Sequence, residues 1–409
     1  MAQTKPKAAQ FYGVSGNGTA GQVLISDGNG GMSWGANTEE STVSWATPTG
    51  QSLTYTQPNP QSSTGALGSS FPTTTFTATK SGEEISGTAT IAGLPTGITA
   101  TQSLSGTGAD NILTVTLTGT FPGADSLNTA LTLSGLTVAA LTVNYLVVAG
   151  GGGGGGVGGG GGAGGYRTNY QGTALILDSS TNYTVTIGGG GAPSATNDPG
   201  NGDGAIGAQG GNSVFHTISS AGGGGGSGAG NTALSGGSGG GSRSGTVGSG
   251  NTPSVTPAQG FSGAAAVSQF GGGGGGASEA GNTDGDTHGG DGLTNAITVA
   301  SGTGPYYAGG GAGGGGGATG GLGGGAASGA NAGTDNTGGG GGGGTWTNNS
   351  NITTQRGGAG GSGIVIIRYP SSFAITNPGS GLTFTTDSTT VANTSITTFT
   401  AGTGNIQFN

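Results

Sequence analysis

The sequence predicts an all-β protein whose central part is a close-packed bundle of extended glycine helices. Six stretches of nearly pure glycine lie between Gly150 and Gly363. An apolar, strand-like segment flanks each end of this region: Tyr145-Leu-Val-Val-Ala149 precedes it and Gly363-Ile-Val-Ile-Ile-Arg-Tyr369 closes it. No part of the chain shows convincing helical periodicity.

The glycine content has two opposite interpretations. The 409 residues include 106 glycines and 14 prolines, a composition that by itself suggests disorder. A polyproline-II-type helix, however, has three residues per turn and no internal hydrogen bonds, so its peptide groups point outward to neighbours. Where such helices crowd together only glycine fits, and runs such as Gly271–Gly276 and Gly338–Gly344 supply glycine at every position. We therefore expect an ordered bundle, in which hydrogen bonds between helices offset the large entropy loss of glycine.

Charge and cysteine content exclude several classes of protein. Only 6% of residues are charged, the net charge is −9, and the seven Lys and Arg residues form no basic stripe, so we expect no nucleic-acid partner. The absence of cysteine rules out disulfides and thiolate metal sites. The first ten residues lack the apolar core of a signal peptide, and no apolar run approaches the roughly 20 residues of a membrane span. We expect no membrane insertion, and a protein made in the cytoplasm and released with a particle.

Composition divides the chain into four segments: 1–38, 39–144, 145–370 and 371–409. In the first, Asp27-Gly-Asn-Gly30 is a strong hairpin signal between two short β-prone stretches. We interpret residues 1–38 as an attachment or oligomerisation unit.

Residues 39–144 alternate apolar residues with Thr and Ser, as in Leu113-Thr-Val-Thr-Leu-Thr118, which is the period-two pattern of half-buried strands. About seven short strands in roughly 100 residues predict an immunoglobulin-like β-sandwich. The other predicted strands are Ser52–Thr56, Thr75–Thr79, Thr88–Ile91, Leu131–Val138 and Leu141–Val148.

The glycine-rich segment 145–370 also contains two ordinary strand patterns, Thr173–Leu177 and Tyr183–Ile187, which we expect to pair as a hairpin. The segment 371–409 is a β-prone tail whose packing partner the sequence leaves open. Its apolar anchors are Leu382, Phe384, Ile396, Phe399, Ile406 and Phe408.

An ordered series of motifs in residues 145–370 resembles the glycine-rich domain of phage tail-fibre and receptor-binding proteins. The motifs are Tyr145-Leu-Val-Val-Ala-Gly-Gly-Gly-Gly-Gly, Gly164-Gly-Tyr-Arg167, Tyr183-Thr-Val-Thr-Ile-Gly-Gly-Gly190, Gly211-Asn-Ser-Val-Phe215 and Gly360-Gly-Ser-Gly-Ile-Val-Ile-Ile-Arg-Tyr369. The resemblance to the distal adhesins of T-even-type phages implies packed polyglycine-II helices whose connecting loops touch the host receptor. In addition, the segment from Asn17 to Trp34 is similar to a short repeat of tailed-phage fibre proteins. Unlike those adhesins, this chain carries its own fibre-like N-terminal segment and a sandwich domain.

Connectivity selects candidate receptor-binding loops. If the strands at Ala149 and Ile364 pair at one base, Gly150–Gly165 runs away from it, so that both Tyr166–Gln171 and Thr345–Arg356 lie at the far end. Aromatic, amide and arginine side chains suit adaptable binding loops, although capping of the bundle is an equal alternative. The loop at Pro305-Tyr306-Tyr307 and the segment around Phe261 and Phe270 are further candidates with undetermined positions. The candidate side chains are Tyr166, Arg167, Asn169, Tyr170, Trp346, Asn348, Asn349, Arg356, Tyr306 and Tyr307.

Enzyme chemistry finds little support in the sequence. The spacing of Asp284, Asp286 and Asp291 loosely resembles a calcium loop, but the terminal bidentate glutamate is missing, which favours a plain solvated turn. The histidines His216 and His288 stand alone, and no glycine run is followed by the Gly-Lys-Ser/Thr of a phosphate loop. We expect no catalytic residue, no bound metal and no cofactor.

The sequence thus predicts a virion fibre protein of a tailed phage that adheres to the bacterial surface. Its expected partners are a host polysaccharide or outer-membrane protein and, through the N-terminal segment, other virion proteins, with a homotrimer as the usual fibre assembly. The alternatives are a decoration or head-fibre protein without a dedicated receptor, and a fibre-borne polysaccharide depolymerase.

Overall fold

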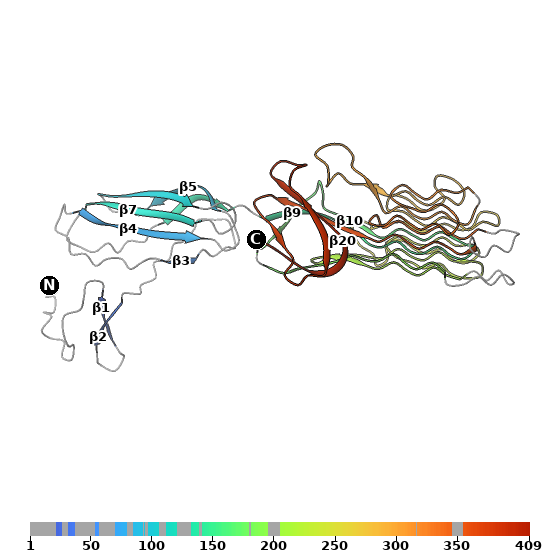
Figure 1. Ribbon diagram of the computed structural model, residues 1–409, viewed down its shortest axis with the longest axis horizontal. Coiled ribbons are helices and arrows are strands. Elements are labelled where there is room, and N and C mark those ends of the chain that lie inside the picture. Colours follow the sequence, from blue (N-terminus) through green and yellow to red (C-terminus); the bar gives the residue numbers. More distant parts are fainter. Residues whose placement is uncertain are drawn as a thin grey trace, which may run out of the picture. The chain divides into compact units, whose positions relative to one another are not determined.

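The computed structural model describes residues 22–26, 32–36, 54–56, 70–79, 85–92, 94, 97–105, 112–120, 132–138, 141–179, 181–194, 205–315, 317–345 and 355–409. The chain divides into two compact units, Met1–Ala140 and Leu141–Asn409 (Figure 1). The regular elements within the described ranges are all β-strands, which agrees with the predicted all-β class. Among these residues no helix is long and apolar enough to span a membrane.

The first unit opens with the predicted hairpin. Strands β1 (Gln22–Ser26) and β2 (Met32–Ala36) are antiparallel, and Ser26 pairs with Met32 across the Asp27–Gly30 turn signal. The pairing confirms that this short segment forms two antiparallel strands.

The rest of the first unit forms two antiparallel sheets. One has the order β3-β4-β7-β6, with β3 (Thr54–Thr56), β4 (Ser70–Thr79), β7 (Ile112–Thr120) and β6 (Ile98–Ser105); the other pairs β5 (Ile85–Ala92) with β8 (Thr132–Val138). Leu113 and Val115 on β7 are buried, as the period-two pattern predicts. Strand β6 was missed because its central Thr101-Gln-Ser sequence offers no apolar face.

The second unit contains a sheet of ten strands. The main path is β10-β9-β17-β20-β12-β13-β14, and β11, β18 and β19 pair with β9 or β20 beside it. The strands are β9 (Leu141–Val148), β10 (Tyr166–Thr168), β11 (Leu175–Leu177), β12 (Tyr183–Thr186), β13 (Ser213–Phe215), β14 (Ile218–Ser220), β17 (Ile364–Pro370), β18 (Ile375–Thr376), β19 (Leu382–Asp387) and β20 (Thr394–Phe408). A separate pair is β15 (Leu293–Thr294) with β16 (Tyr306–Tyr307).

The ten-stranded sheet is nearly closed. Its two edge strands meet where the Arg167 guanidinium donates to the Ser219 carbonyl at 3.3 Å and the Gly165 N–H donates to the Ala221 carbonyl at 2.8 Å. Side chains therefore pack on both faces of β9. Tyr145 and Val147 join a cluster with Phe215, Phe399 and Phe408, whereas alternate residues contact a second cluster. The second cluster includes Leu146, Val148, Tyr166, Ile297, Tyr307, Ile364 and Ile366.

Three predictions about this sheet have clear outcomes. The strands flanking the glycine region do pair: Val148 of β9 lies opposite Ile364 of β17. The expected hairpin of β11 with β12 is wrong, because β11 pairs with β9 and β12 pairs with β13 and β20. Strand β9 crosses the predicted boundary between residues 144 and 145, and the second unit begins at Leu141.

The C-terminal tail packs on the second unit. Strand β20 pairs with both β17 and β12, so the tail completes the sheet at the base of the glycine region. Of the predicted apolar anchors, Ile396, Phe399, Ile406 and Phe408 are buried.

The glycine segments run side by side from this sheet as extended, nearly straight chains (Figure 1). Gly150–Gly156 is surrounded by six others. Its N–H groups donate in rotation: residues 150, 153 and 156 to segment 205–211, residues 151 and 154 to segment 357–363, and residues 152 and 155 to segment 158–165. Its carbonyls accept in the same rotation from segments 221–227, 188–194 and 338–344, with N···O distances of 2.8–3.3 Å. Each residue therefore turns by about a third of a revolution relative to the one before it.

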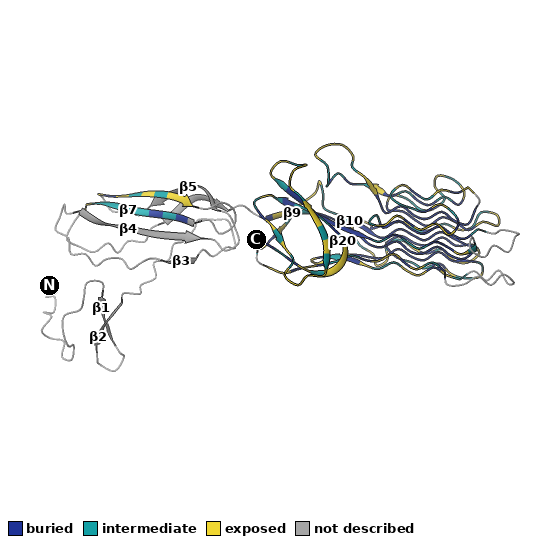
Figure 2. Cartoon of the chain, in the orientation of Figure 1, coloured by how far each residue is buried: buried dark blue, intermediate teal, exposed yellow. Residues whose placement is uncertain are grey.

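Close packing leaves no room for side chains along the inner glycine segments, which are mostly dark blue in Figure 2, whereas the outer segments are partly exposed. A Cβ placed on Gly152 would fall well inside contact distance of the Gly224 carbonyl, and one on Gly161 would meet the Gly152 carbonyl in the same way. The obstacle is backbone, which cannot rotate aside as a side chain can. Glycine is thus required by space rather than by an unusual φ at these positions.

Candidate functional site

The glycine segments have two ends, which we call the sheet end and the distal end. Segment 150–156 leaves the sheet at β9 and turns at Val157, whose φ is 42°. Segment 158–165 then returns, and Tyr166 of β10 lies opposite Val148 of β9. The predicted placement of Tyr166–Gln171 at the far end is therefore wrong, because the glycine run contains a turn and crosses the bundle twice.

At the sheet end the candidate side chains Tyr166, Arg167 and Tyr170 form hydrogen bonds with neighbouring strands and loops. Tyr166 is buried, its hydroxyl donates to the Thr294 carbonyl at 3.2 Å, and it accepts a hydrogen bond from Asn295 Nδ2 at 2.7 Å. Tyr170 accepts a hydrogen bond from Arg368 at 3.2 Å, and the Arg368 guanidinium also lies 5.6 Å from its ring centroid. With Arg167 closing the sheet edges, these residues have structural partners within the described part of the chain.

Asn169 fills a gap between two strands. Strands β10 and β11 pair with successive parts of the same edge of β9, and Asn169 lies between them. Its Oδ1 accepts from the Tyr145 N–H at 2.6 Å, and its Nδ2 donates to the carbonyls of Val143 and Thr173 at 3.1 Å each. The amide side chain thus replaces the backbone partner that β9 lacks at this point.

The predicted pair Tyr306 and Tyr307 also lies towards the sheet. Tyr307 is buried in the cluster that contains Val148 and Tyr166, whereas Tyr306 is 45% exposed. Burial raises the pKa of Tyr307 to about 12, and the neighbouring Tyr166 adds to the shift.

This raised pKa predicts a loss of stability in alkali. Below about pH 10 the phenol is neutral in both states; between about pH 10 and 12 it ionises only when unfolded, so the free energy of unfolding should fall by about 2–3 kcal/mol. Burial also raises the pKa of Tyr145, Tyr166, Tyr183 and Tyr369, which extends the decline. Urea unfolding at about pH 9 and about pH 11.5 should show a smaller drop for Tyr307→Phe than for the natural chain. Equal drops would contradict this assignment.

The distal end consists of the turns that join outgoing and returning glycine segments. Val157 is central among them: its N–H donates to the Gln355 carbonyl at 2.8 Å, and its carbonyl accepts from the Arg243 guanidinium at 3.1 Å. Gly230 N–H donates to Ser244 Oγ at 2.7 Å and ties together the two turns that contain them. These hydrogen bonds connect the described turns at this end to one another.

Two exposed side chains stand out at the distal end. Phe270 is 48% exposed and precedes Gly271, which packs against the Gly158 backbone. Arg356 is exposed. It follows Gln355, whose carbonyl accepts from Val157, and it therefore lies at the distal end, as predicted for the segment Thr345–Arg356. The other predicted residues of that segment, Trp346, Asn348 and Asn349, lie outside the described residues. Arg243 was not predicted, although it is one of only seven basic residues and stands alone in a glycine- and serine-rich stretch.

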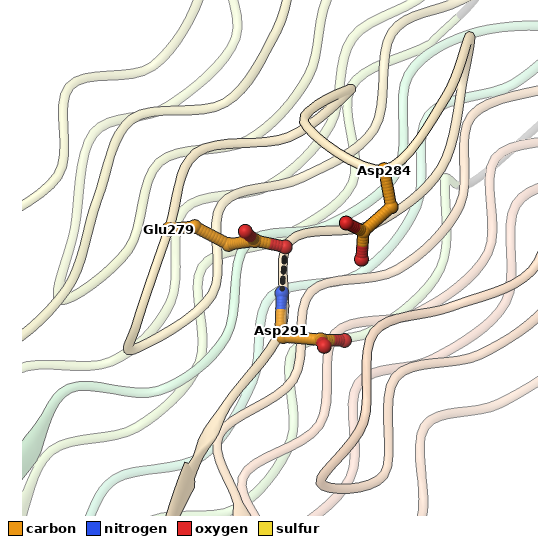
Figure 3. Close-up of side chains that lie close together, drawn as sticks. All are labelled: Glu279, Asp284 and Asp291. Atoms are coloured by element: carbon orange, nitrogen blue, oxygen red, sulfur yellow. Dashed lines mark hydrogen bonds between the residues drawn. The ribbon is translucent and has the colours of Figure 1, made fainter.

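Three carboxylates within residues 279–291 lie close together (Figure 3). Glu279, Asp284 and Asp291 each offer an oxygen within 4.8 Å of the others, whereas the predicted Asp286 is not part of the group. Glu279 Oε1 accepts from the Asp291 N–H at 3.0 Å, and Asp291 Oδ1 accepts from the Leu322 N–H at 2.7 Å. Burial, and then the charges of its two neighbours, raise the pKa of Glu279. Glu279 and Asp291 thus serve as acceptors for loop N–H groups.

Comparison with known proteins gives one result. A family model described as a glycine-rich domain matches residues 126–370, which is more than half of the chain. Neither the search of curated proteins nor the search of solved structures found a match. The matched region includes β9, β17 and the glycine segments between them. The chain therefore belongs to the glycine-rich domain family.

Proposed function

We propose that this chain is a structural fibre protein of a tailed-phage virion and that it adheres to the bacterial surface through the distal turns of its glycine-rich unit. The observation that carries the proposal is the threefold rotation of hydrogen bonds around Gly150–Gly156. This arrangement supports a polyglycine-II lattice, since three residues per turn would aim successive peptide groups at three neighbours. The alternating strands of residues 39–138 similarly support an immunoglobulin-like sandwich as a spacer.

A lattice of this kind would be a stiff platform for variable loops. Its segments have almost no side chains of their own, so chemical variety is concentrated in the turns at each end. Because packed strands fill most of the sheet end, we assign the contact with the host surface to the distal turns. Exposed Phe270 and Arg356 among glycine, serine and asparagine match the composition of adaptable binding surfaces. Several copies on one particle, as a trimer would supply, would strengthen individually weak contacts.

The partners follow from this reading. The distal turns would bind a polysaccharide or outer-membrane protein of the host, and the hairpin segment 1–38 would attach the chain to other virion proteins. The chain would then act by adhesion rather than by catalysis.

A matched pair of aromatic variants tests the proposal. Phe270 and Tyr306 are almost equally exposed, at 48% and 45%, but Phe270 is distal and Tyr306 lies near the sheet. A panel of bacteria is first screened with the labelled full-length protein, and a strain that binds it is selected. For that strain we expect Phe270→Ala to lower the affinity of the protein for the cells by about fivefold or more. Tyr306→Ala should leave binding unchanged.

Two results would contradict the proposal. One is the absence of saturable binding to every strain in the panel. The other is an equal loss of cell binding in the two variants when both are folded, as shown by circular dichroism spectra and melting temperatures like those of the natural chain.

A further inference from the structure

An open surface pocket with both polar and apolar lining lies at the sheet end, away from the distal turns. It forms where the turn between β18 and β19 faces β12 and β20, and its volume is about 450 Å³. That volume falls within the range of about 300–1,000 Å³ that is usual for small-molecule sites. The lining residues are Asn182, Thr184, Pro378, Gly379, Ser380, Thr403, Gly404 and Asn405.

The pocket presents hydrogen-bonding groups without charge. Three hydroxyls and two amides line it, and none of the lining residues is ionisable. Thr184 Oγ1 donates to Asn405 Oδ1 at 3.1 Å, which fixes the amide and directs its donor capacity to Nδ2. The lining therefore suits a neutral ligand that can form hydrogen bonds, since it offers no counter-charge for an ion.

We propose that this pocket binds one residue of a neutral sugar. Sugar hydroxyls both donate and accept, which matches a lining of neutral hydroxyls and amides, whereas an apolar ligand would leave these groups without partners. The proposal goes beyond the distal adhesive surface and does not depend on it. Either one can fail while the other holds.

Two glycines allow a clean test. Gly379 lines the pocket and Gly189 does not; both are exposed, and a Cβ on either one would meet no atom within 4 Å. Neither has a φ that excludes side chains. Gly379→Trp should therefore obstruct the pocket without a clash in the fold, and Gly189→Trp is the matched control.

Binding is measured by calorimetry and saturation-transfer NMR with the full-length protein. The probes are the methyl glycosides of glucose, galactose, mannose and N-acetylglucosamine, with galacturonate as a charged comparison. We expect at least one neutral sugar to bind with a Kd of about 1 mM or tighter. Its affinity should fall at least about tenfold in Gly379→Trp and stay unchanged in Gly189→Trp. Asn182→Ala, which removes an exposed lining amide, should also weaken binding and serves if the tryptophan variant is poorly folded.

The proposal is overturned if no neutral sugar saturates the protein, or if Gly379→Trp and Asn182→Ala both retain the natural Kd. Tighter binding of galacturonate than of every neutral sugar would also overturn it, because the lining offers no positive charge.

Discussion

Gly152→Ala lowers the free energy of unfolding of the glycine-rich unit by about 3 kcal/mol or more. The added Cβ would collide with the carbonyl of Gly224, a backbone atom that is itself hydrogen-bonded to segment 158–165. Relief of the collision requires two segments to move apart, which breaks further hydrogen bonds along both. Thermal and urea unfolding followed by circular dichroism would measure the change.

Gly189→Ala is the matched control for this prediction. A Cβ there would meet no atom within 4 Å, and the residue does not have a positive φ. The substitution reduces the entropy of the unfolded chain, so stability should stay the same or rise by up to about 1 kcal/mol. Similar stability of the two alanine variants would show that the segments are not packed as described.

Asn169→Ala has the second large effect, a loss of about 2–3 kcal/mol in the free energy of unfolding. It removes the partners of the Tyr145 N–H and the Val143 carbonyl, two groups on the central strand β9. Asn169→Asp is a sharper probe, because a carboxylate can still accept from Tyr145 but cannot donate to Val143 or Thr173. It should destabilise the chain at least as much as alanine does.

Asn331→Ala provides the comparison for Asn169. Asn331 is exposed and its Nδ2 makes one hydrogen bond, to the Ser328 carbonyl at 2.7 Å. Its replacement should cost no more than about 1 kcal/mol. If Asn169→Ala is equally mild, water replaces the side chain at β9 and the amide has no bridging role.

The bundle could be predicted from sequence because its requirement is simple. A run of glycine is expected where neighbouring backbones leave no space for a Cβ. The apolar strands on either side of the glycine region show where it attaches to a sheet. The same reasoning predicted the pairing of β9 with β17, which is set by the chain entering and leaving one base.

The ends of the segments were harder to predict. The sequence predicts a single crossing for Gly150–Gly165, whereas the chain turns at Val157 and crosses twice. The structure shows why it is a turn: alanine occurs inside the packed region, as at the buried Ala163 and Ala312, but valine is too large for it. A bulky residue within a glycine run is therefore the signal for a turn, and its use would have placed Tyr166 at the sheet.

The roles of Asn169 and of the C-terminal tail depend on contacts between distant parts of the chain. Nothing in the sequence near Asn169 shows that β10 and β11 share an edge of β9 with a gap between them. Strand β20 alternates well enough to be recognised as a strand, but its pairing with both β17 and β12 is fixed only when the sheet closes.

Amide hydrogen exchange on protein labelled with ¹⁵N-glycine tests the central claim most directly. If each peptide group in Gly150–Gly156 is hydrogen-bonded to a neighbouring segment, these amides should exchange at least about 1,000-fold more slowly than in a free peptide. The exposed Gly302 and Gly379 should exchange rapidly in the same sample. Rapid exchange throughout Gly150–Gly156 would contradict a hydrogen-bonded glycine lattice.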